Sequence, residues 1–477
     1  MTATLGEVCT ALGAPVPIGA ASVPPLVGAT HDSRQVGEGW LFCCVPGANV
    51  DGHDFAPAAV EAGAAALLVE RALEIDAPQV RVADVRVAMG AAAAVIEGRP
   101  SDDLTVIGVT GTNGKSSVVQ ILGDIWTKAG IKTDIYGTLT GARTTPEATD
   151  LQRRLRRSQE QGYRAVAMEV SSHALDLQRV NGTAFAAAIF TNLSRDHLDY
   201  HETMEAYFAA KSQLFYREFT SIAVVNLDDD YGVRLAGHVL ERPGIELHGY
   251  RMEDAEGLVI DGPRSTFTWR GRPISLSLAG RHNVSNALAA ATTAAALGLD
   301  LDDIADALCA TVPVRGRFEM IDVGQPFLLA VDYAHTPDAL ESVLVAADQT
   351  AAGRVIVVFG CGGDRDVAKR PMMGEVAQRL SSLAVVTSDN PRSEDPLAII
   401  DDILNGTTWT AGADGASTDL LVEPDRRAAI AVALEQARPG DIVVIAGKGH
   451  EVEQIVGDEV TAFDDRQVAL EALGALA

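Results

Sequence analysis

Long apolar runs are missing from this sequence of 477 residues. No run approaches the roughly 20 residues that a membrane-spanning helix needs. The longest candidate, residues 287–299, is rich in alanine and contains two threonines, so a packed helix is the simpler interpretation. The first residues show no basic region followed by an apolar core, and we expect no secretory signal. A protein without membrane insertion is therefore predicted.

Cysteine is also scarce. The chain has five cysteines, an odd number, and their spacing matches no common metal site. We therefore expect reduced thiols and a cytoplasmic location. With 47% hydrophobic residues and 477 residues in total, the chain should form roughly three globular domains. We expect it to act as a monomer.

Positive charge is in deficit. Lysine and arginine number 38 against 65 acidic residues, which gives a formal net charge of −27. This balance argues against a nucleic-acid partner, because the phosphate backbone would be repelled. Small anions remain possible, since salt screens bulk charge beyond about 8 Å. The densest basic cluster comprises Arg153, Arg154, Arg156 and Arg157, and its helical context predicts a solvated helix face.

The order of apolar runs predicts an α/β protein of three domains. Residues 1–97 should form an N-terminal α/β domain, residues 98–317 a central domain and residues 318–477 a C-terminal Rossmann-like domain. The central domain should hold a doubly wound, mostly parallel sheet with strands at 105–110, 132–136, 165–170, 187–192 and 223–226. An antiparallel flap at 258–278 and a helix at 283–297 should follow. In the C-terminal domain we expect strands at 327–333, 355–359, 384–387 and 442–445.

A glycine-rich segment stands between the first central strand and a helix predicted for 116–129. It contains Gly111, Thr112, Asn113, Gly114, Lys115, Ser116 and Ser117. Its backbone N–H groups and the helix N-terminus suit a nucleotide phosphate, Lys115 can reach the outer phosphates, and Ser116 can contact Mg²⁺. The spacing departs from the usual phosphate-loop rule, because Val109 stands where the outer glycine belongs. A plain glycine turn is the alternative.

Three residues near the ends of later elements could add chemistry. Glu169 ends an apolar strand, where a carboxylate can hold Mg²⁺, although a buried structural glutamate is the alternative. His197 follows the next strand and should lie at the same sheet edge. On spacing alone it could equally be a ligand or an ordinary surface or core residue. Lys211 reads in isolation as an ordinary helix lysine.

Taken together, the motifs resemble those of the Mur ligase family, and specifically the UDP-N-acetylmuramoyl-tripeptide synthetases (the MurE type). The resemblance covers nearly the whole chain, and each motif is modest alone. The matching segments include Asp-Ser-Arg at 32–34, Thr-Gly-Thr-Asn-Gly-Lys-Ser at 110–116, Thr-Thr-Pro at 144–146, and residues 169–173, 192–201, 210–211, 283, 286, 316–319, 332–337 and 362–366. Asp-Asn-Pro-Arg at 389–392 and Gly-Lys-Gly-His-Glu at 447–451 complete them.

The resemblance implies an ATP-dependent amide ligation. ATP would phosphorylate the free side-chain carboxylate of D-glutamate in UDP-MurNAc-L-Ala-D-Glu, and an amine of a diamino acid would then displace phosphate. It also implies that Ser116 and Glu169 hold one Mg²⁺, and that Glu169 and His197 hold a second beside Lys211 in carbamylated form. The implied ATP contacts outside the loop are Asn283, Asn286, Arg317, Asp332 and His335. The implied contacts of the UDP-linked substrate are Ser33, Thr144, Thr145, Ser171 and Arg179.

The identity of the added amino acid depends on the C-terminal motifs. The segment containing Asp389, Asn390, Pro391 and Arg392 resembles the version that binds meso-diaminopimelate. A guanidinium offers the planar fork that a carboxylate accepts, so Arg392 would bind the distal carboxylate, with Arg365 near it. Gly447 and Glu451 would hold the distal amino acid end. Alternatively, Arg392 pairs only with Glu394 or Asp395. A lysine-adding ligase, a ligase like folylpolyglutamate synthase and a non-catalytic Mur-like binding protein are the rival functions.

Overall fold

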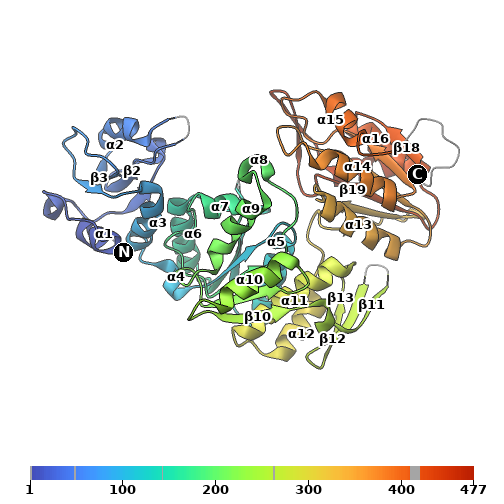
Figure 1. The fold of residues 1–477 in the computed structure, drawn as a ribbon, viewed down its shortest axis with the longest axis horizontal. Coiled ribbons are helices and arrows are strands. Elements are labelled where there is room, and N and C mark those ends of the chain that lie inside the picture. Colours follow the sequence, from blue (N-terminus) through green and yellow to red (C-terminus); the bar gives the residue numbers. More distant parts are fainter. Residues whose placement is uncertain (1–2, 48–49, 142, 262–263, 409–418, 477) are drawn as a thin grey trace.

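The computed structural model describes residues 3–47, 50–141, 143–261, 264–408 and 419–476. Three mostly parallel β-sheets, each with its own helices, follow one another along the chain, and two smaller antiparallel sheets accompany them; this confirms the predicted α/β class (Figure 1). The N-terminal domain lies at one end, the central domain in the middle and the C-terminal domain at the other end (Figure 1). The limits 1–97, 98–317 and 318–477 remain our proposal. Among the described residues, no helix has both the length and the apolar character needed to span a membrane.

The N-terminal domain is built on a four-stranded parallel sheet with the order β1-β2-β3-β4. Its strands are β1 (Gly28–Thr30), β2 (Trp40–Cys43), β3 (Ala64–Val69) and β4 (Gln79–Arg81). Its helices are α1 (Leu5–Leu12), η1 (Ala20–Ser22), η2 (Ser33–Gln35), η3 (Gly52–Phe55), α2 (Ala56–Glu61) and α3 (Val85–Ile96). Helix α3 also packs against helix α6 (Ala148–Glu160) of the central domain, so it joins the two domains.

The central domain contains a six-stranded parallel sheet with the order β10-β9-β8-β5-β7-β6. Its strands are β5 (Thr105–Thr110), β6 (Thr133–Tyr136), β7 (Ala165–Glu169), β8 (Ala187–Phe190), β9 (Ile222–Asn226) and β10 (Glu246–Tyr250). The connecting helices are α4 (Pro100–Asp103), α5 (Lys115–Lys128), α6, α7 (Ser172–Asp176), α8 (Leu198–His201), α9 (Met204–Ser212), η4 (Gln213–Phe215) and α10 (Asp230–Leu240). Since all six strands run the same way, their carboxyl ends share one edge, where ligands bind in such folds.

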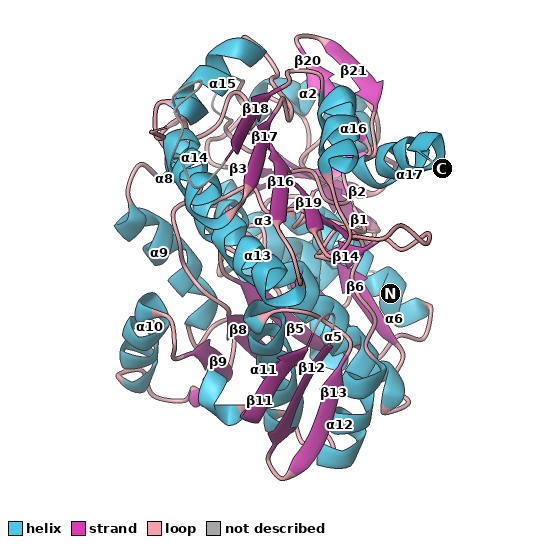
Figure 2. Ribbon diagram, turned by 90° about the vertical axis from the view of Figure 1, so that its right-hand side faces the viewer, coloured by secondary structure: helices cyan, strands magenta, loops and turns pink. Residues whose placement is uncertain are grey.

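The predicted antiparallel flap is present as a three-stranded sheet after η5 (Met252–Asp254). Its strands are β11 (Glu256–Asp261), β12 (Arg264–Trp269) and β13 (Arg272–Leu276). Helices α11 (Arg281–Ala296) and α12 (Leu301–Ala310) follow, and both pack against α5. Figure 2 shows this sheet beside α11 and α12, at the end of the molecule opposite β20 and β21.

The C-terminal domain has a six-stranded sheet with the order β14-β15-β19-β16-β17-β18, parallel except for the edge strand β14. Its strands are β14 (Glu319–Met320), β15 (Leu328–Asp332), β16 (Val355–Phe359), β17 (Leu383–Val386), β18 (Asp419–Val422) and β19 (Ile442–Ala446). Its helices are α13 (Pro337–Thr350), α14 (Lys369–Leu380), α15 (Pro396–Leu404), α16 (Arg426–Gln436) and α17 (Asp465–Leu476). A hairpin of β20 (Glu453–Val456) and β21 (Glu459–Ala462) stands apart from this sheet.

Both faces of the two large sheets are buried, as a doubly wound fold requires. Adjacent residues of β5 point to opposite faces, so Val106 packs in one hydrophobic cluster and Ile107 in another. Strand β16 of the C-terminal domain shows the same alternation, because its adjacent residues Ile356 and Val357 belong to different hydrophobic clusters. The cores therefore hold each sheet between two helical layers and leave the loops at the strand ends exposed for chemistry.

Candidate active site

The glycine-rich loop between β5 and α5 depends on its two inner glycines. Gly111 has φ +146° and Gly114 has φ +87°. A Cβ atom would lie 1.9 Å from Thr191 Oγ1 at the first position and 2.4 Å from Asn286 Oδ1 at the second. No side chain caps α5 at Gly114, so the loop leads directly to the N–H groups of the first helical turn, as an anion site requires.

Two lysines lie beneath this loop. Lys115 Nζ donates to the carbonyl oxygens of Gly111 at 3.0 Å and Thr112 at 2.8 Å. Lys211 Nζ donates to the same Gly111 oxygen at 2.8 Å and lies 4.6 Å from the ring centre of Tyr207. Burial lowers the pKa of both amines, and the charge of Lys115 lowers that of Lys211 further, to well below its usual value. Lys211 is therefore not a solvated helix lysine.

Ser116 and Glu169 meet at the carboxyl ends of β5 and β7. Ser116 Oγ donates to Glu169 Oε1 at 2.9 Å, and the backbone N–H of Thr138 donates to the same oxygen at 3.0 Å. Arg317, from the segment that leads into the C-terminal domain, donates from Nη2 to Ser116 Oγ at 3.1 Å. The predicted hydroxyl–carboxylate pair is thus brought together, with a cation from the domain junction beside it.

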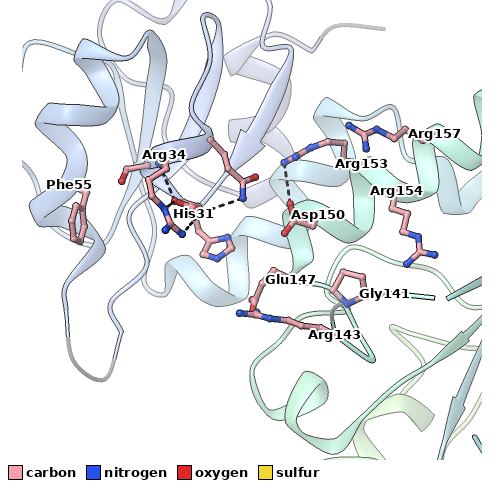
Figure 3. A pocket seen from close by; sticks show the side chains of 14 residues that line it. His31, Arg34, Phe55, Gly141, Arg143, Glu147, Asp150, Arg153, Arg154 and Arg157 are labelled. Atoms are coloured by element: carbon pink, nitrogen blue, oxygen red, sulfur yellow. Dashed lines mark hydrogen bonds and ion pairs between the residues drawn. The ribbon is translucent and has the colours of Figure 1, made fainter. Parts of the chain in front are cut away.

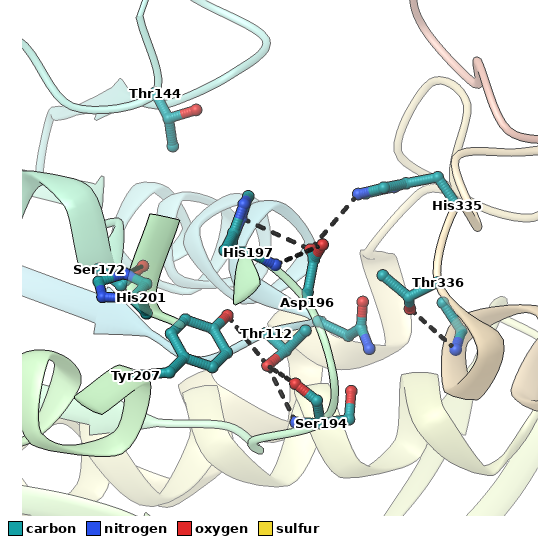
Figure 4. Close-up of polar contacts among 12 residues, drawn as sticks. Thr112, Thr144, Ser172, Ser194, Asp196, His197, His201, Tyr207, His335 and Thr336 are labelled. Carbon is teal, nitrogen blue, oxygen red and sulfur yellow. Dashed lines mark hydrogen bonds and ion pairs between the residues drawn. The ribbon is translucent and has the colours of Figure 1, made fainter. Parts of the chain in front are cut away.

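His197 belongs to a charged cluster at the same sheet edge (Figure 4). Asp196 Oδ2 lies 3.5 Å from His197 Nε2 and 3.7 Å from His335 Nε2, and Asp196 Oδ1 lies 3.8 Å from Lys369 Nζ. Burial lowers the pKa of His197 to about 3, so its ring is neutral near pH 7. Burial would raise the pKa of Asp196, but the hydrogen bond to His335 and the nearby cations hold it well below its usual value.

A cavity of about 410 Å³ opens between the central and C-terminal domains beside the loop. It gathers Asn113, Gly114 and Ser117 with the predicted ATP contacts Asn283 and Asn286. Arg317, Asp332 and His335 line the same cavity from the junction and the C-terminal domain. Both carboxylate oxygens of Asp332 accept backbone N–H groups, from Phe318 at 2.6 Å and Ala334 at 2.7 Å. Asp332 therefore also braces the domain junction.

A second cavity of about 520 Å³ lies next to the first, and Lys115 lines it. The predicted substrate residues Thr144, Thr145, Ser171 and Arg179 line it together with Ser116, Glu169 and His197. Buried Glu147 pairs with Arg179 at 2.9 Å and also with Arg143. The two cavities share five residues: Asn113, Gly114, Arg317, Tyr333 and His335. A nucleotide in one cavity and a carboxylate in the other would therefore face each other across the loop.

Ser33 lies in a third cavity, of about 880 Å³, between the N-terminal domain and α6 (Figure 3). Arg34, Arg143, Arg153, Arg154 and Arg157 line this cavity. The prediction of a solvated arginine face is wrong for Arg153 and Arg154. Arg153 Nη2 donates to Ala29 O at 3.0 Å and its guanidinium lies 4.8 Å from the Trp40 ring centre, while that of Arg154 lies 3.8 Å from the Tyr136 ring centre. Aromatic neighbours distant in sequence caused the difference.

The residues predicted to bind the amino-acid substrate form a separate group in the C-terminal domain. None of these described residues lines either of the two cavities beside the glycine-rich loop. Arg392 Nη1 donates to Gly363 O at 2.7 Å, and Arg365 Nη1 donates to Asp364 O at 3.0 Å. Asn390 Nδ2 donates to Glu451 Oε2 at 2.9 Å. A Cβ atom at Gly447 would lie 2.6 Å from Asp389 Oδ2. Pro391 lies between Asn390 and Arg392, and its carbonyl oxygen would lie 1.8 Å from a Cβ atom at Gly363.

The alternative partners of Arg392 are engaged elsewhere. Glu394 pairs with Arg370 at 2.8 Å, and Asp395 caps α15 by accepting from Leu397 N at 2.9 Å. Burial and the neighbouring charge of Arg365 lower the pKa of Arg392. Within the described part of the chain, neither arginine forms an ion pair at 4.0 Å or less. Two adjacent guanidinium groups are thus left to receive an external anion.

Sequence reasoning missed several residues of the site. Asp196 stands next to His197 in the matched segment, and that position could have drawn attention to it. No local pattern pointed to Lys369 or Tyr207. Lys369 contacts Asp196 and Tyr207 contacts Thr112, and both contacts join residues far apart in sequence. Thr138 reaches Glu169 from the loop after β6 in the same way.

Three family models match the chain in order. The Mur ligase family catalytic domain matches residues 26–101, the Mur ligase middle domain residues 109–294 and the Mur ligase glutamate ligase domain residues 316–449. The chain belongs to the Mur ligase family. The resemblance inferred from the motifs is therefore confirmed.

Curated relatives within the Mur ligase family match this chain over nearly its whole length. The UDP-N-acetylmuramoyl-L-alanyl-D-glutamate–2,6-diaminopimelate ligase of Geobacillus kaustophilus is 45% identical, over 94% of this chain and 95% of the relative. The ligase of the same name from Streptomyces coelicolor is 44% identical, over 98% and 96%. A solved structure with this name superimposes with a TM-score of 0.72 at 32% identity, over 100% of this chain and 99% of that one.

More distant structures share only the fold of this Mur ligase. The folylpolyglutamate synthase of Mycobacterium tuberculosis, complexed with ADP and AMPPCP, superimposes with a TM-score of 0.61 at 17% identity, over 76% of this chain and 92% of that one. The predicted three-domain fold is confirmed by these superpositions.

Proposed function

We propose that this Mur ligase joins meso-diaminopimelate to UDP-MurNAc-L-Ala-D-Glu in an ATP-dependent reaction of peptidoglycan precursor synthesis. The curated relatives that match nearly its whole length are named UDP-N-acetylmuramoyl-L-alanyl-D-glutamate–2,6-diaminopimelate ligase. The observation that carries the proposal is the arrangement of the glycine-rich loop, which separates one cavity suited to a nucleotide from another lined by the substrate-type residues.

In the first step, ATP would lie with its adenine towards Asn283 and Asn286 and its phosphates on residues 111–117. Lys115 would turn from the loop carbonyls to the outer phosphates, and Arg317 would approach from the junction. The D-glutamate side-chain carboxylate would attack the terminal phosphorus and form an acyl phosphate, with ADP released. A carboxylate is a poor electrophile, so this phosphorylation supplies the leaving group that amide formation needs.

The residues present fit Mg²⁺. Ser116 Oγ and Glu169 Oε1, 2.9 Å apart, are hard oxygen donors at a strand edge, and His197 offers a neutral ring nitrogen in the same cavity. Among the described residues, no group of three or more His, Cys, Asp and Glu side chains could hold a metal ion. We propose that Ser116, Glu169, His197 and a carbamylated Lys211 supply the protein ligands. Bound Mg²⁺ would neutralise charge on the transferring phosphoryl group.

Carbamylation of Lys211 is supported by its surroundings. Only an uncharged amine can combine with CO₂, and burial beside Lys115 favours the uncharged form of Lys211. The product would present a carboxylate beneath the loop instead of an ammonium group. A negative group there would also compensate the charge of Lys115.

The UDP-linked substrate would extend from the cavity around Ser33 to the one around Ser171. Arginines line the first cavity, and Thr144, Thr145 and Arg179 line the second. The paired phosphates of UDP would thus meet positive charge despite the acidic net charge of the chain. We also propose that the enzyme acts as a monomer in the cytoplasm, where ATP is available.

In the second step, an amine of the diamino acid would attack the acyl phosphate and release phosphate. Arg392 and Arg365 form no ion pair with the described residues, which supports a substrate with a carboxylate at its far end, as diaminopimelate has and lysine lacks. Neither arginine lines the two reaction cavities, so we infer that the C-terminal domain closes for this step.

The test is phosphate release by the purified protein with ATP, Mg²⁺ and UDP-MurNAc-L-Ala-D-Glu. meso-Diaminopimelate, lysine and glutamate would be supplied separately, and the peptide product would be identified by mass spectrometry. We expect turnover with meso-diaminopimelate far above the other two. Preference for lysine or for glutamate, or no turnover at all, would each reject the proposal.

A further inference from the structure

A buried lysine stands in the middle of the proposed amino-acid site. Lys448 follows β19 between Gly447, with φ +116°, and Gly449, with φ +55°, and its side chain is 0% exposed. Burying an ammonium group is costly unless it is paired and hydrogen-bonded. The position of Lys448 therefore requires a reason in the groups that it contacts.

Among the described residues, both polar partners of the Lys448 ammonium group belong to the amino-acid site. Lys448 Nζ donates to Asn390 Oδ1 at 3.0 Å and pairs with Glu451 Oε2 at 3.3 Å. Asn390 Nδ2 donates to the same Glu451 oxygen at 2.9 Å. The three side chains therefore form a closed triangle, in which the carboxylate of Glu451 is held from two directions.

Asn390 is also fixed from outside this triangle. Its Oδ1 accepts the backbone N–H of Ile455, in β20, at 3.0 Å. The amide oxygen of Asn390 thus accepts hydrogen bonds from both Lys448 and the β20–β21 hairpin, and its amide nitrogen donates one to Glu451. These internal bonds make Asn390 part of the frame that carries Glu451, beyond any contact it makes with substrate.

The hairpin holds Arg392 as well. Arg392 N donates to Ile455 O at 3.0 Å, and Gly457 N donates to Arg392 O at 2.6 Å. Arg392 has φ +54°, an unfavourable value for a residue other than glycine. Gln454 Nε2 adds a bond to Asp389 O at 2.9 Å. Ile455 is therefore the common point to which both Arg392 and Asn390 are tied.

Recognition of the far end of a diamino acid needs such a frame. The far carbon carries a carboxylate and an ammonium group, and its configuration decides on which side each lies. A cationic group and an anionic group at a fixed separation can accept one configuration and reject the other. Arg392 and Glu451 supply these charges, and Lys448, which has no exposed surface, can act only through its partners.

We propose that Lys448 is a positioning residue that fixes Glu451 and Asn390 relative to Arg392 and so sets the selection of configuration at the far carbon of the diamino acid. This inference rests on the proposed function. It assigns to Lys448 no contact with substrate and no part in phosphoryl transfer.

The test compares wild type, Lys448→Met, Gln454→Ala and the exposed control Lys128→Met. For each, kcat and KM would be measured for ATP, the UDP-linked acceptor, meso-diaminopimelate and LL-diaminopimelate, with thermal unfolding recorded in parallel. For Lys448→Met we expect KM for meso-diaminopimelate to rise at least about tenfold, and the meso:LL ratio of kcat/KM to fall by a similar factor. KM for ATP and for the acceptor should stay unchanged. Gln454→Ala should lower the meso:LL ratio of kcat/KM by a smaller factor. Lys128→Met should change neither this ratio nor any KM value.

A double variant distinguishes positioning from general damage. If Lys448 acts through Glu451, adding Lys448→Met to Glu451→Gln should change KM for meso-diaminopimelate by less than about threefold. An unchanged meso:LL ratio in Lys448→Met, or an equal rise of all KM values, would overturn the inference. Should Lys448→Met fail to fold, an unchanged ratio in Gln454→Ala would overturn it. Wild type that turns over no diaminopimelate would instead reject the proposed function, and the inference with it.

Discussion

Lys115 and Lys211 donate to one and the same carbonyl oxygen, that of Gly111. Two amines this close, one buried and one half-buried, cannot both keep a full positive charge without a compensating anion. Their different neighbours indicate different tasks. Lys115 begins helix α5 at the end of the glycine-rich loop, whereas Lys211 lies on α9, against the ring of Tyr207.

Replacing Lys115 tests the phosphate site. Lys115→Ala should abolish ligation, because the outer phosphates lose their nearest fixed positive charge during transfer. The measurement is the turnover number for phosphate release at saturating ATP. A loss of less than about tenfold, roughly 1.4 kcal/mol in the barrier, would mean that the loop is not the catalytic phosphate site.

Replacing Lys211 tests the carbamate. Lys211→Ala should be nearly inactive, and a short-chain carboxylate such as acetate should restore part of the rate by occupying the vacated space. Chloride at the same ionic strength is the control for a salt effect. An active variant, with no response of either protein to acetate or bicarbonate, would return Lys211 to an ordinary structural role.

Replacing Arg392 tests the identity of the amino acid. Arg392→Ala should weaken the use of meso-diaminopimelate far more than that of ATP or the acceptor. A charged hydrogen bond contributes roughly 1.5–3 kcal/mol, so kcat/KM for diaminopimelate should drop about tenfold to a hundredfold. Lysine, which lacks the distal carboxylate, should lose less. Equal losses with both amino acids would make Arg392 a structural loop residue.

Residues of this site could be predicted from the sequence where they stand together in one short segment and their side-chain types indicate one chemistry. The phosphate loop is local, so strand, glycines, lysine and helix could be read from one segment. The ion pairs of Asp196 with His335 and Lys369 join distant segments, and no local pattern specifies them. Arg154 shows the same limit, since its stacking on Tyr136 depends on how α6 packs against the central sheet.

At the scale of elements, helix α3 of the N-terminal domain packs against the loop that follows α7 in the central domain. A Cβ atom at Gly90, in the middle of α3, would lie 2.2 Å from the carbonyl oxygen of Asn181. Asn181 Nδ2 in turn donates to Val87 O at 3.2 Å. Helix and loop thus meet backbone to backbone, and the absence of a side chain at Gly90 sets their separation.

Gly90→Ala should push the N-terminal domain away from the central domain. Alanine favours a helix by about 1 kcal/mol over glycine, but the collision with a backbone oxygen should outweigh this gain. We expect KM for the UDP-linked acceptor to rise while KM for ATP stays constant. Gly237→Ala, in α10, is the matched control, because nothing lies within 4 Å of its added Cβ. Equal effects of the two variants would contradict this account of α3.

Interior strands of the two six-stranded sheets were predicted almost to the residue, whereas some edge strands and all four strands of the N-terminal sheet were not predicted. Strand β5 occupies Thr105–Thr110 and β16 occupies Val355–Phe359, as expected from their continuous apolar runs. Strands β10, β14 and β18 lie at sheet edges, and β10 and β18 are largely exposed. An edge strand buries less surface and so carries no such run, which explains why β10 and β18 escaped notice.

At the scale of the whole molecule, the central and C-terminal domains meet through charge. Asp196 of the central domain faces His335 and Lys369 of the C-terminal domain, and Arg195 pairs with Asp366 at 3.2 Å. The nucleotide-type cavity lies at the same junction and takes lining residues from both domains. The order of domains could be predicted from the sequence, but this junction could not.

Because that cavity is shared, a nucleotide in it should make two domains melt as one. Ligand at a hundred times its Kd stabilises the form that binds it by about 2.7 kcal/mol, and here that form includes both domains. In calorimetry with a non-hydrolysable ATP analogue, the C-terminal transition should move upward and merge with the central one. His335→Ala should reduce the merging and leave the central transition shifted. A C-terminal transition that stays in place would mean that the nucleotide rests on the central domain alone. If the two transitions merge as expected, ATP has a structural effect before it reacts: it makes the central and C-terminal domains unfold as a single cooperative unit.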